Sequence, residues 1–159
     1  MNDELLARIQ RLEDIEAIRH LKARYCLACD DNYNPEALAP LFAEDAIWDG
    51  GILGYNEGRS AIKAFFSQSS AMVPWALHYV TNPIIEVDND MATGNWLLWE
   101  PMTFAMGETK TGCWHCASYS DEYVKVNGEW LFKKVKINIE VLSPYNNNFG
   151  EVPVIDPQA

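Results

Sequence analysis

The sequence predicts one α+β domain whose N-terminal helices pack on a strongly curved, largely antiparallel sheet. Apolar residues recur every three or four positions from about residue 4 to residue 30, which is typical of a long amphipathic helix. From Trp75 onward the chain is instead rich in Val, Ile, Thr, Trp and Tyr. Helices come first and strands then follow one another, so we expect an antiparallel meander. A chain of 159 residues has the length of one domain with one core.

Three helices are predicted in the first half. The apolar stripe of the first helix, over residues 4–30, consists of Leu5, Ile9, Leu12, Ile15, Ile18, Leu21 and Tyr25. The run 30–35 ends this helix, and Asn34 then caps a second one that starts at Pro35 and carries Leu38, Leu41 and Phe42. A strand over 45–50 and a loop over 51–58 follow. Ser60 is expected to cap the third, short helix.

Four strands are predicted in the second half, over residues 77–88, 91–106, 112–127 and 129–142. The turn residues Asp88-Asn89-Asp90 separate the first two, and Asn127-Gly128 is a strong hairpin signal before the last. The folded domain is therefore placed at 1–142. The remainder, 143–159, is rich in Pro, Gly and Asn, and we expect an extended tail that covers a neighbouring subunit or the mouth of a pocket.

Charge and hydropathy narrow the class of partner. The formal net charge is -11, so the surface repels phosphate backbones and anionic lipid, and we expect neither nucleic acid nor a membrane as a partner. The first residues lack the apolar core of a signal peptide, and no apolar run approaches the ~18 residues of a membrane span. The expected location is the cytoplasm.

The four cysteines form two pairs, Cys26-x-x-Cys29 and Cys113-x-x-Cys116, with the spacing of zinc knuckles. The first pair lies on one face of a helix, whereas residues three apart in a strand point to opposite faces. Four sulfurs so placed do not converge on one ion, and disulfides are rare in the cytoplasm. We therefore predict core or surface thiols and no metal site.

Two polar residues of the first helix stand where apolar ones would be expected. Tyr25 lies on the buried stripe, and Asp30 ends the helix, where the macrodipole disfavours a carboxylate. A cationic partner or a raised pKa would offset the unfavourable interaction between the Asp30 carboxylate and the helix macrodipole. Alternatively, Asp30 only helps to end the helix.

Two further candidates lie on predicted strands. His78 opens a strand face that continues at period two through Val80, Asn82 and Ile84, and this face is predicted to point inward. Such a His is either a hydrogen-bonded core residue or, with a carboxylate in reach, a general base.

Glu100 follows Trp96 and Leu98 at period two, so an inward Trp96 implies an inward carboxylate. A buried carboxylate is costly unless it is paired, which makes it a candidate site residue. Alternatively, the strand has reached the rim of the sheet, since Pro101 favours a bend there.

Large side chains around these candidates are expected to line a pocket, although the same residues are equally consistent with an ordinary core. His115 shares a strand face with Cys113 and Tyr119, and the sequence leaves open which face points inward. The predicted pocket residues are Trp48, Phe65, Trp75, Trp96, Leu98, His115 and Tyr119.

Five blocks between residue 14 and about residue 140 resemble, in order and spacing, the SnoaL-like, scytalone-dehydratase-like superfamily (nuclear-transport-factor-like, cystatin-like). The blocks are DIEAIRHLKARYCLACDD, EALAPLFAEDAIWDGG, EGRSAIKAFF, LHYVTNPIIEVDNDMATGNW and SYSDEYVKVNGEWLFKK. The chain is most similar to the bile acid 7α-dehydratase branch, with which it shares DIEAI-x-x-LKA-x-Y, ATG-x-W and the D-x-Y-x-K-hydrophobic-x-G-x-W hairpin.

The resemblance implies a cone-shaped α+β barrel that encloses an apolar pocket, and catalysis without a metal or an organic cofactor. It also implies a working set of a Tyr and an Asp from the first helix, a His that opens a strand, and an acid on the next strand. Local alignment places these roles on Tyr25, Asp30, His78 and Glu100. The branch has Asp where this chain has Glu100, and its members do not match the loop 51–58.

We therefore expect a dehydratase that eliminates water from a hydroxylated steroid-like or polycyclic substrate activated by a carbonyl group. His78, held by Asp30, would remove the proton next to the carbonyl. Tyr25 would donate to the enolate oxygen or the leaving hydroxyl, and Glu100 would act as the acid. The alternatives are isomerisation or cyclisation by the same base, and a non-catalytic small subunit of a ring-hydroxylating dioxygenase.

The resemblance also implies a homo-oligomer, and a trimer is expected in preference to a dimer. Leu97 and Trp99 lie on the strand face opposite to Trp96 and Glu100, so they form an outer apolar surface that an identical subunit would cover.

Overall fold

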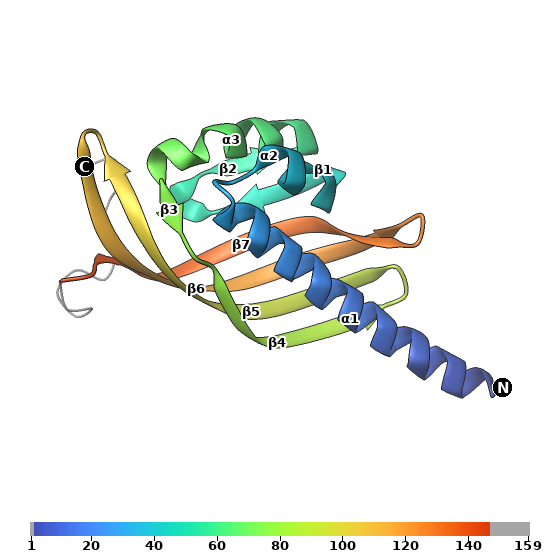
Figure 1. Cartoon of the computed structure of the whole chain (residues 1–159). Helices are drawn as coiled ribbons and strands as arrows, with labels where there is room; N and C mark the ends of the chain where they lie inside the picture. Colours follow the sequence, from blue (N-terminus) through green and yellow to red (C-terminus); the bar gives the residue numbers. More distant parts are fainter. Residues whose placement is uncertain (1, 147–159) are drawn as a thin grey trace.

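The computed structural model describes residues 2–146 and confirms the α+β class (Figure 1). The helical elements are α1 (Asp3–Asp30), α2 (Pro35–Leu38), the 3-10 turns η1 (Ala39–Leu41) and η2 (Gly51–Leu53), and α3 (Arg59–Met72). The strands are β1 (Phe42–Asp49), β2 (Tyr55–Glu57), β3 (Trp75–Ala76), β4 (Tyr79–Asp88), β5 (Met91–Met106), β6 (Thr109–Val126) and β7 (Glu129–Pro144).

The seven strands form one curved, unclosed sheet. Its order is β2-β1-β7-β6-β5-β3, with β4 pairing β5 along the earlier part of that strand. All pairs are antiparallel except β1 with β7. The helices α1, α2 and α3 lie over one side of the sheet (Figure 1). The predicted meander is confirmed, but the sheet stays open instead of closing into a barrel.

The first helix extends beyond the sheet at its N-terminus (Figure 1). Leu5, Ile9 and Leu12, predicted on the buried stripe, are therefore exposed, and burial begins only at Asp14. From Ile18 to Cys29 one face of α1 is in the core. The apolar spacing continues into the first turns of α1, which extend past the last strand that could cover them. The predicted burial of these turns was therefore wrong.

Two buried polar contacts hold α1 against the sheet. The Lys22 ammonium lies 2.8 Å from Asp121 Oδ2 on β6, and neither side chain is exposed to solvent. The same ammonium lies 3.1 Å from the centroid of the Tyr119 ring. About two turns before Lys22, Asp14 accepts a hydrogen bond of 2.9 Å from the Trp130 indole on β7. Removing one partner of a buried ion pair typically costs about 3–5 kcal/mol, so the Lys22 contact fixes the height of α1 above β6.

Other differences from the sequence prediction are local. Phe42 begins β1 instead of ending the second helix, and the loop 51–58 contains η2 and β2. The α3 helix begins after Gly58, whose φ of 87° favours glycine, and Ser60 is not its cap. At the other end β7 continues to Pro144, two residues into the predicted tail, and residues 147–159 lie outside the described part of the chain.

No helix within residues 2–146 has both the length and the apolar character needed to cross a membrane.

Candidate active site

Asp30 and His78 form a direct pair between the end of α1 and the start of β4. Asp30 Oδ1 accepts a hydrogen bond of 2.9 Å from the backbone N–H of His78 and lies 2.7 Å from His78 Nδ1. Asp30 lies at an unfavourable position at the end of the helix, and its predicted partner there is the imidazole of His78. The two bonds fix both the backbone position and the ring orientation of His78, whose side chain is only 6% exposed.

The inward position of His78 has a different cause from the one predicted. The residue stands just before β4, and the strand alternation is broken at Asn82, which has a φ of 52°. The pairing of β4 with β5 shifts between Thr81 and Ile84, so Ile84 is 65% exposed instead of facing inward. The contact with Asp30, and not an unbroken strand face, determines where His78 points.

Glu100 lies between two imidazole rings. Its side chain is 4% exposed, and β5 continues past it to Met106, so Pro101 does not mark the rim of the sheet. Glu100 Oε2 lies 2.7 Å from His115 Nδ1, and Glu100 Oε1 lies 3.4 Å from His78 Nε2. The resulting sequence of contacts is Asp30, His78, Glu100, His115. It shows that the face of β6 that carries His115 points inward.

Burial and the neighbouring charges shift the pKa values of Glu100 and His78 in opposite directions. Burial alone would raise the pKa of Glu100, but the charge of His78 and the hydrogen bond from His115 outweigh it and lower the pKa. Burial alone would lower the pKa of His78, but the charge of Glu100 and the hydrogen bond to Asp30 raise it. Glu100 is thus held as an anion that is hydrogen-bonded to His115 and lies close to the charge of His78. These surroundings do not favour the acid role that the resemblance implied for it.

A narrow apolar cavity of about 40 Å³, partly open to solvent, lies beside the cluster. His78, Glu100 and His115 lie in its wall. Of the predicted pocket residues, those that line it are Trp48, Phe65, His115 and Tyr119. Its described lining contains no Lys or Arg side chain, so the cavity is suited to an uncharged ring better than to a phosphate or carboxylate.

Three predicted pocket residues do not line the cavity. Trp75 lies on the short edge strand β3 and is 51% exposed. Trp96 and Leu98 do point inward, but the cavity meets β5 only further along, at Glu100 and Met102. Trp96 instead donates a hydrogen bond of 3.0 Å to the Tyr123 hydroxyl. The period-two pattern found the correct face of β5 but could not locate the cavity along it.

Tyr25 contributes a hydroxyl to the cavity wall. Its oxygen accepts a hydrogen bond of 2.9 Å from the Trp48 indole, which leaves the Tyr25 O–H as a donor. Burial raises the pKa of Tyr25 well above its ordinary value, so this proton is retained. Tyr33, which sequence reasoning missed, also lines the cavity and packs edge-on against the His78 ring at 6.1 Å. It lies in the turn after α1, where no periodic pattern identifies an inward residue.

The cysteines are free thiols on the elements predicted for them. Cys26 and Cys29 are buried in α1, and Cys113 and Cys116 lie on opposite faces of β6. Within residues 2–146, no group of three or more His, Cys, Asp or Glu side chains is placed to hold a metal ion. The absence of a metal or cofactor in the working protein remains a prediction.

Comparison with known proteins identifies the family to which the fold belongs. The profile of the SnoaL-like domain family matches residues 10–136. The uncharacterized protein Rv2910c of Mycobacterium tuberculosis is 28% identical over 132 residues, which cover 80% of this chain and 86% of that protein.

Two solved structures share the fold at low identity. A protein of Novosphingobium aromaticivorans, provisionally named a scytalone dehydratase, has a TM-score of 0.73 and 24% identity over 87% of this chain and 91% of that chain. The hexachlorocyclohexane dehydrochlorinase LinA-type3 of Novosphingobium barchaimii has a TM-score of 0.79 and 22% identity over 89% of this chain and 96% of that chain.

The pairing of His78 with Asp30 predicts a titration that responds to either residue. In side-chain ¹⁵N NMR spectra, His78 should titrate above the reference value of about 6.5, and Asp30→Asn should lower its pKa because the variant loses the carboxylate charge. The resonances of His20, which is 74% exposed, should be unchanged by the substitution and serve as the internal control. A His78 pKa that does not change in Asp30→Asn would show that the two residues are not coupled.

Proposed function

Because the chain belongs to the SnoaL-like domain family, we propose that it is a small-molecule lyase, a dehydratase that removes water from a hydroxylated, carbonyl-activated cyclic substrate. The observation that carries the proposal is the buried imidazole–carboxylate cluster in the wall of an apolar cavity. A binding or scaffold subunit has no need for a buried His between two carboxylates, since each buried charge is costly. The steroid-like substrate class and the cytoplasmic location are parts of this proposal.

His78 is the base in the proposed reaction. With Nδ1 held by Asp30, the lone pair of a neutral His78 ring is on Nε2, in the cavity wall. This atom takes the proton on the carbon next to the substrate carbonyl. The imidazolium that forms lies between the carboxylates of Asp30 and Glu100, and a positioned base of this kind contributes about 10²–10⁴-fold to the rate.

Tyr25 stabilises the charge that this step creates. Its retained O–H proton can be donated to the enolate oxygen from the aromatic wall of the cavity. The wall is formed largely by aromatic side chains, which exclude water and strengthen such a hydrogen bond. An uncharged cyclic ketone or enone is the substrate class that these surroundings favour.

Isomerisation or cyclisation by the same base is the second candidate function. It is favoured by the anionic state of Glu100, which leaves this residue without a proton for a leaving hydroxyl. Both candidates share the first step, proton removal by His78. They differ in whether a carbon–oxygen bond then breaks.

Activity assays on a panel of hydroxysteroids, their thioesters and small hydroxylated aromatics should depend on the His78–Asp30 pair. We expect His78→Ala to reduce kcat by at least about three orders of magnitude and Asp30→Asn by nearly as much, with a double variant little worse than either. His20→Ala, at an exposed position, should be fully active. A His78→Ala protein that retains wild-type turnover would contradict the proposed base.

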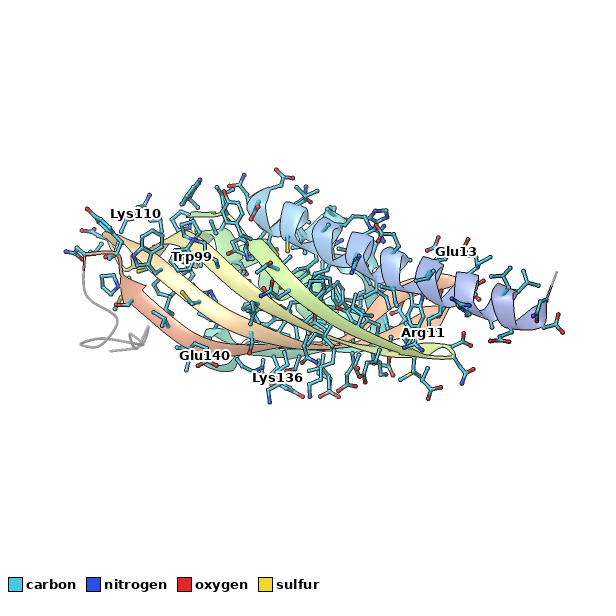
Figure 2. All side chains as sticks on the ribbon, turned by 90° about the horizontal axis from the view of Figure 1, so that it is seen from below. Arg11, Glu13, Trp99, Lys110, Lys136 and Glu140 are labelled. Carbon is cyan, nitrogen blue, oxygen red and sulfur yellow. The ribbon has the colours of Figure 1, made fainter. Side chains whose placement is uncertain are left out.

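We further propose that the chain forms a homo-oligomer, a trimer in preference to a dimer, through the outer face of the sheet. Leu97 and Trp99 are 48% and 43% exposed, and Trp99 stacks on Trp114 of β6 at 4.8 Å. Figure 2 shows Trp99 toward the end of the sheet that lies far from the start of α1. Exposed apolar surface of this kind is typical of an interface.

Light scattering at micromolar concentration should therefore give about three times the mass of one chain. Trp99→Glu should shift the protein toward monomer, because a carboxylate in the interface is desolvated without a partner. Tyr55→Glu, at an exposed aromatic on β2 at the opposite edge of the sheet from β5, is the control and should leave the mass unchanged. A monomeric wild-type protein would defeat the proposal.

A further inference from the structure

One ring nitrogen of a residue that lines the cavity is buried without a partner. Within residues 2–146, the buried side-chain nitrogen and oxygen atoms that lack a hydrogen-bond partner are His115 Nε2, Asp121 Oδ1 and Ser143 Oγ. Of these three residues, His115 is the one in the wall of the cavity. Burying a polar atom without a hydrogen bond is unfavourable, so such an atom in a cavity wall points to a ligand that supplies the bond.

The orientation of the His115 ring is fixed by its other nitrogen. Nδ1 lies 2.7 Å from Glu100 Oε2, and the two residues face each other across the pairing of β5 with β6. The side chain is 2% exposed, so the ring has little freedom to turn away. Because Nδ1 is taken up by the carboxylate, Nε2 is the ring nitrogen left to contact a ligand. This arrangement repeats the one that Asp30 gives to His78.

Glu100 couples the two rings. Its two oxygens contact His78 and His115 separately, so the same carboxylate stabilises a positive charge on either ring. A proton can therefore be gained at one ring and lost at the other with no change in the net charge of the cluster. A buried cluster surrounded by apolar residues favours such an exchange, since any net change in its charge would be costly.

We propose that His115 is a second catalytic residue, which donates the proton that the leaving hydroxyl needs. The inference rests on the proposed elimination and assigns the acid role to His115 in place of Glu100. His78 Nε2 takes the proton from the carbon next to the carbonyl, and that electron pair forms the carbon–carbon double bond. The carbon–oxygen bond breaks with its electron pair on oxygen, and His115 Nε2 gives this oxygen its proton, so that water leaves. His78 is then protonated and His115 neutral, and exchange of one proton with solvent at each ring restores the starting state.

A leaving group that needs no proton separates the acid from the base. The probes are a cyclic β-hydroxy ketone and the matching β-(para-nitrophenoxy) ketone, whose phenolate leaves unprotonated and is coloured. His115→Asn keeps an amide donor near Glu100 but removes the Nε2 position. It should lower kcat on the hydroxy ketone about 10²–10⁴-fold and leave kcat on the nitrophenoxy ketone within a few-fold of the wild type.

Two further variants complete the comparison. His115→Gln, which has a polar group that cannot transfer a proton in this way, should show the same selective loss, and it replaces His115→Asn if that protein does not fold. His78→Asn should lose activity on both ketones, because both need the base. His20→Asn should lose activity on neither.

The outcomes distinguish this inference from the proposed function. Equal losses on both ketones in the His115 variants, or no loss on either, would overturn the acid role while leaving the base role of His78 intact. A wild-type protein that eliminates from neither ketone would overturn the proposed function and this inference with it. A selective loss on the hydroxy ketone alone supports both.

Discussion

The contact between the Asp30 carboxylate and His78 joins the helical part of the molecule to its sheet at the cavity. Asp30 ends a 28-residue helix, and His78 precedes the strand that covers the edge of β5. One carboxylate oxygen binds both the backbone and the ring of His78, so the position of α1 decides where the proposed base points. The Lys22–Asp121 ion pair, two turns earlier on α1, is what holds the helix at that height. The site thus depends on buried polar contacts as much as on apolar packing.

The cavity wall gives these contacts their chemical effect. The aromatic rings around Tyr25 and His78 exclude water, and in such surroundings charges interact more strongly than they do at a surface. The Glu100 carboxylate remains ionised there because the charge of His78 and the hydrogen bond from His115 compensate its burial. The cluster is therefore best described as a unit, because a proton added to one imidazole changes the affinity of the other imidazole for a proton.

Local patterns in the sequence predicted the main helices and strands and the inward face of β5, but not how the strands pair with one another. The alternation of apolar residues along β5 correctly turned Glu100 inward, and the unfavourable helix end correctly selected Asp30. The face of His115 stayed open because the hairpin turn between β5 and β6 was not identified. The turn at Gly107-Glu108 pairs Met106 with Thr109, and the register that follows puts Glu100 opposite His115.

Other parts of the structure could not be predicted because they depend on tertiary contacts. The exposed start of α1 follows from where the sheet ends, which helical periodicity does not encode. The break of β4 at Asn82 depends on a left-handed backbone that Asn tolerates but does not require. Trp96 and Leu98 were assigned to the pocket because they share a face with Glu100. The place of the cavity along that face is set by α3 and the turn after α1, which supply Phe66 and Tyr33 to its wall.

The most direct test of the coupled cluster is the His78 titration in Glu100→Gln. Glutamine keeps the size and hydrogen-bonding capacity of the side chain but removes the charge between the two rings. Side-chain ¹⁵N NMR of the folded variant should give a lower His78 pKa than the wild type, because the Glu100 charge is the largest influence that raises it. A His78 pKa that is the same in Glu100→Gln and in the wild type would show that Glu100 does not join the two imidazoles, and would contradict the account.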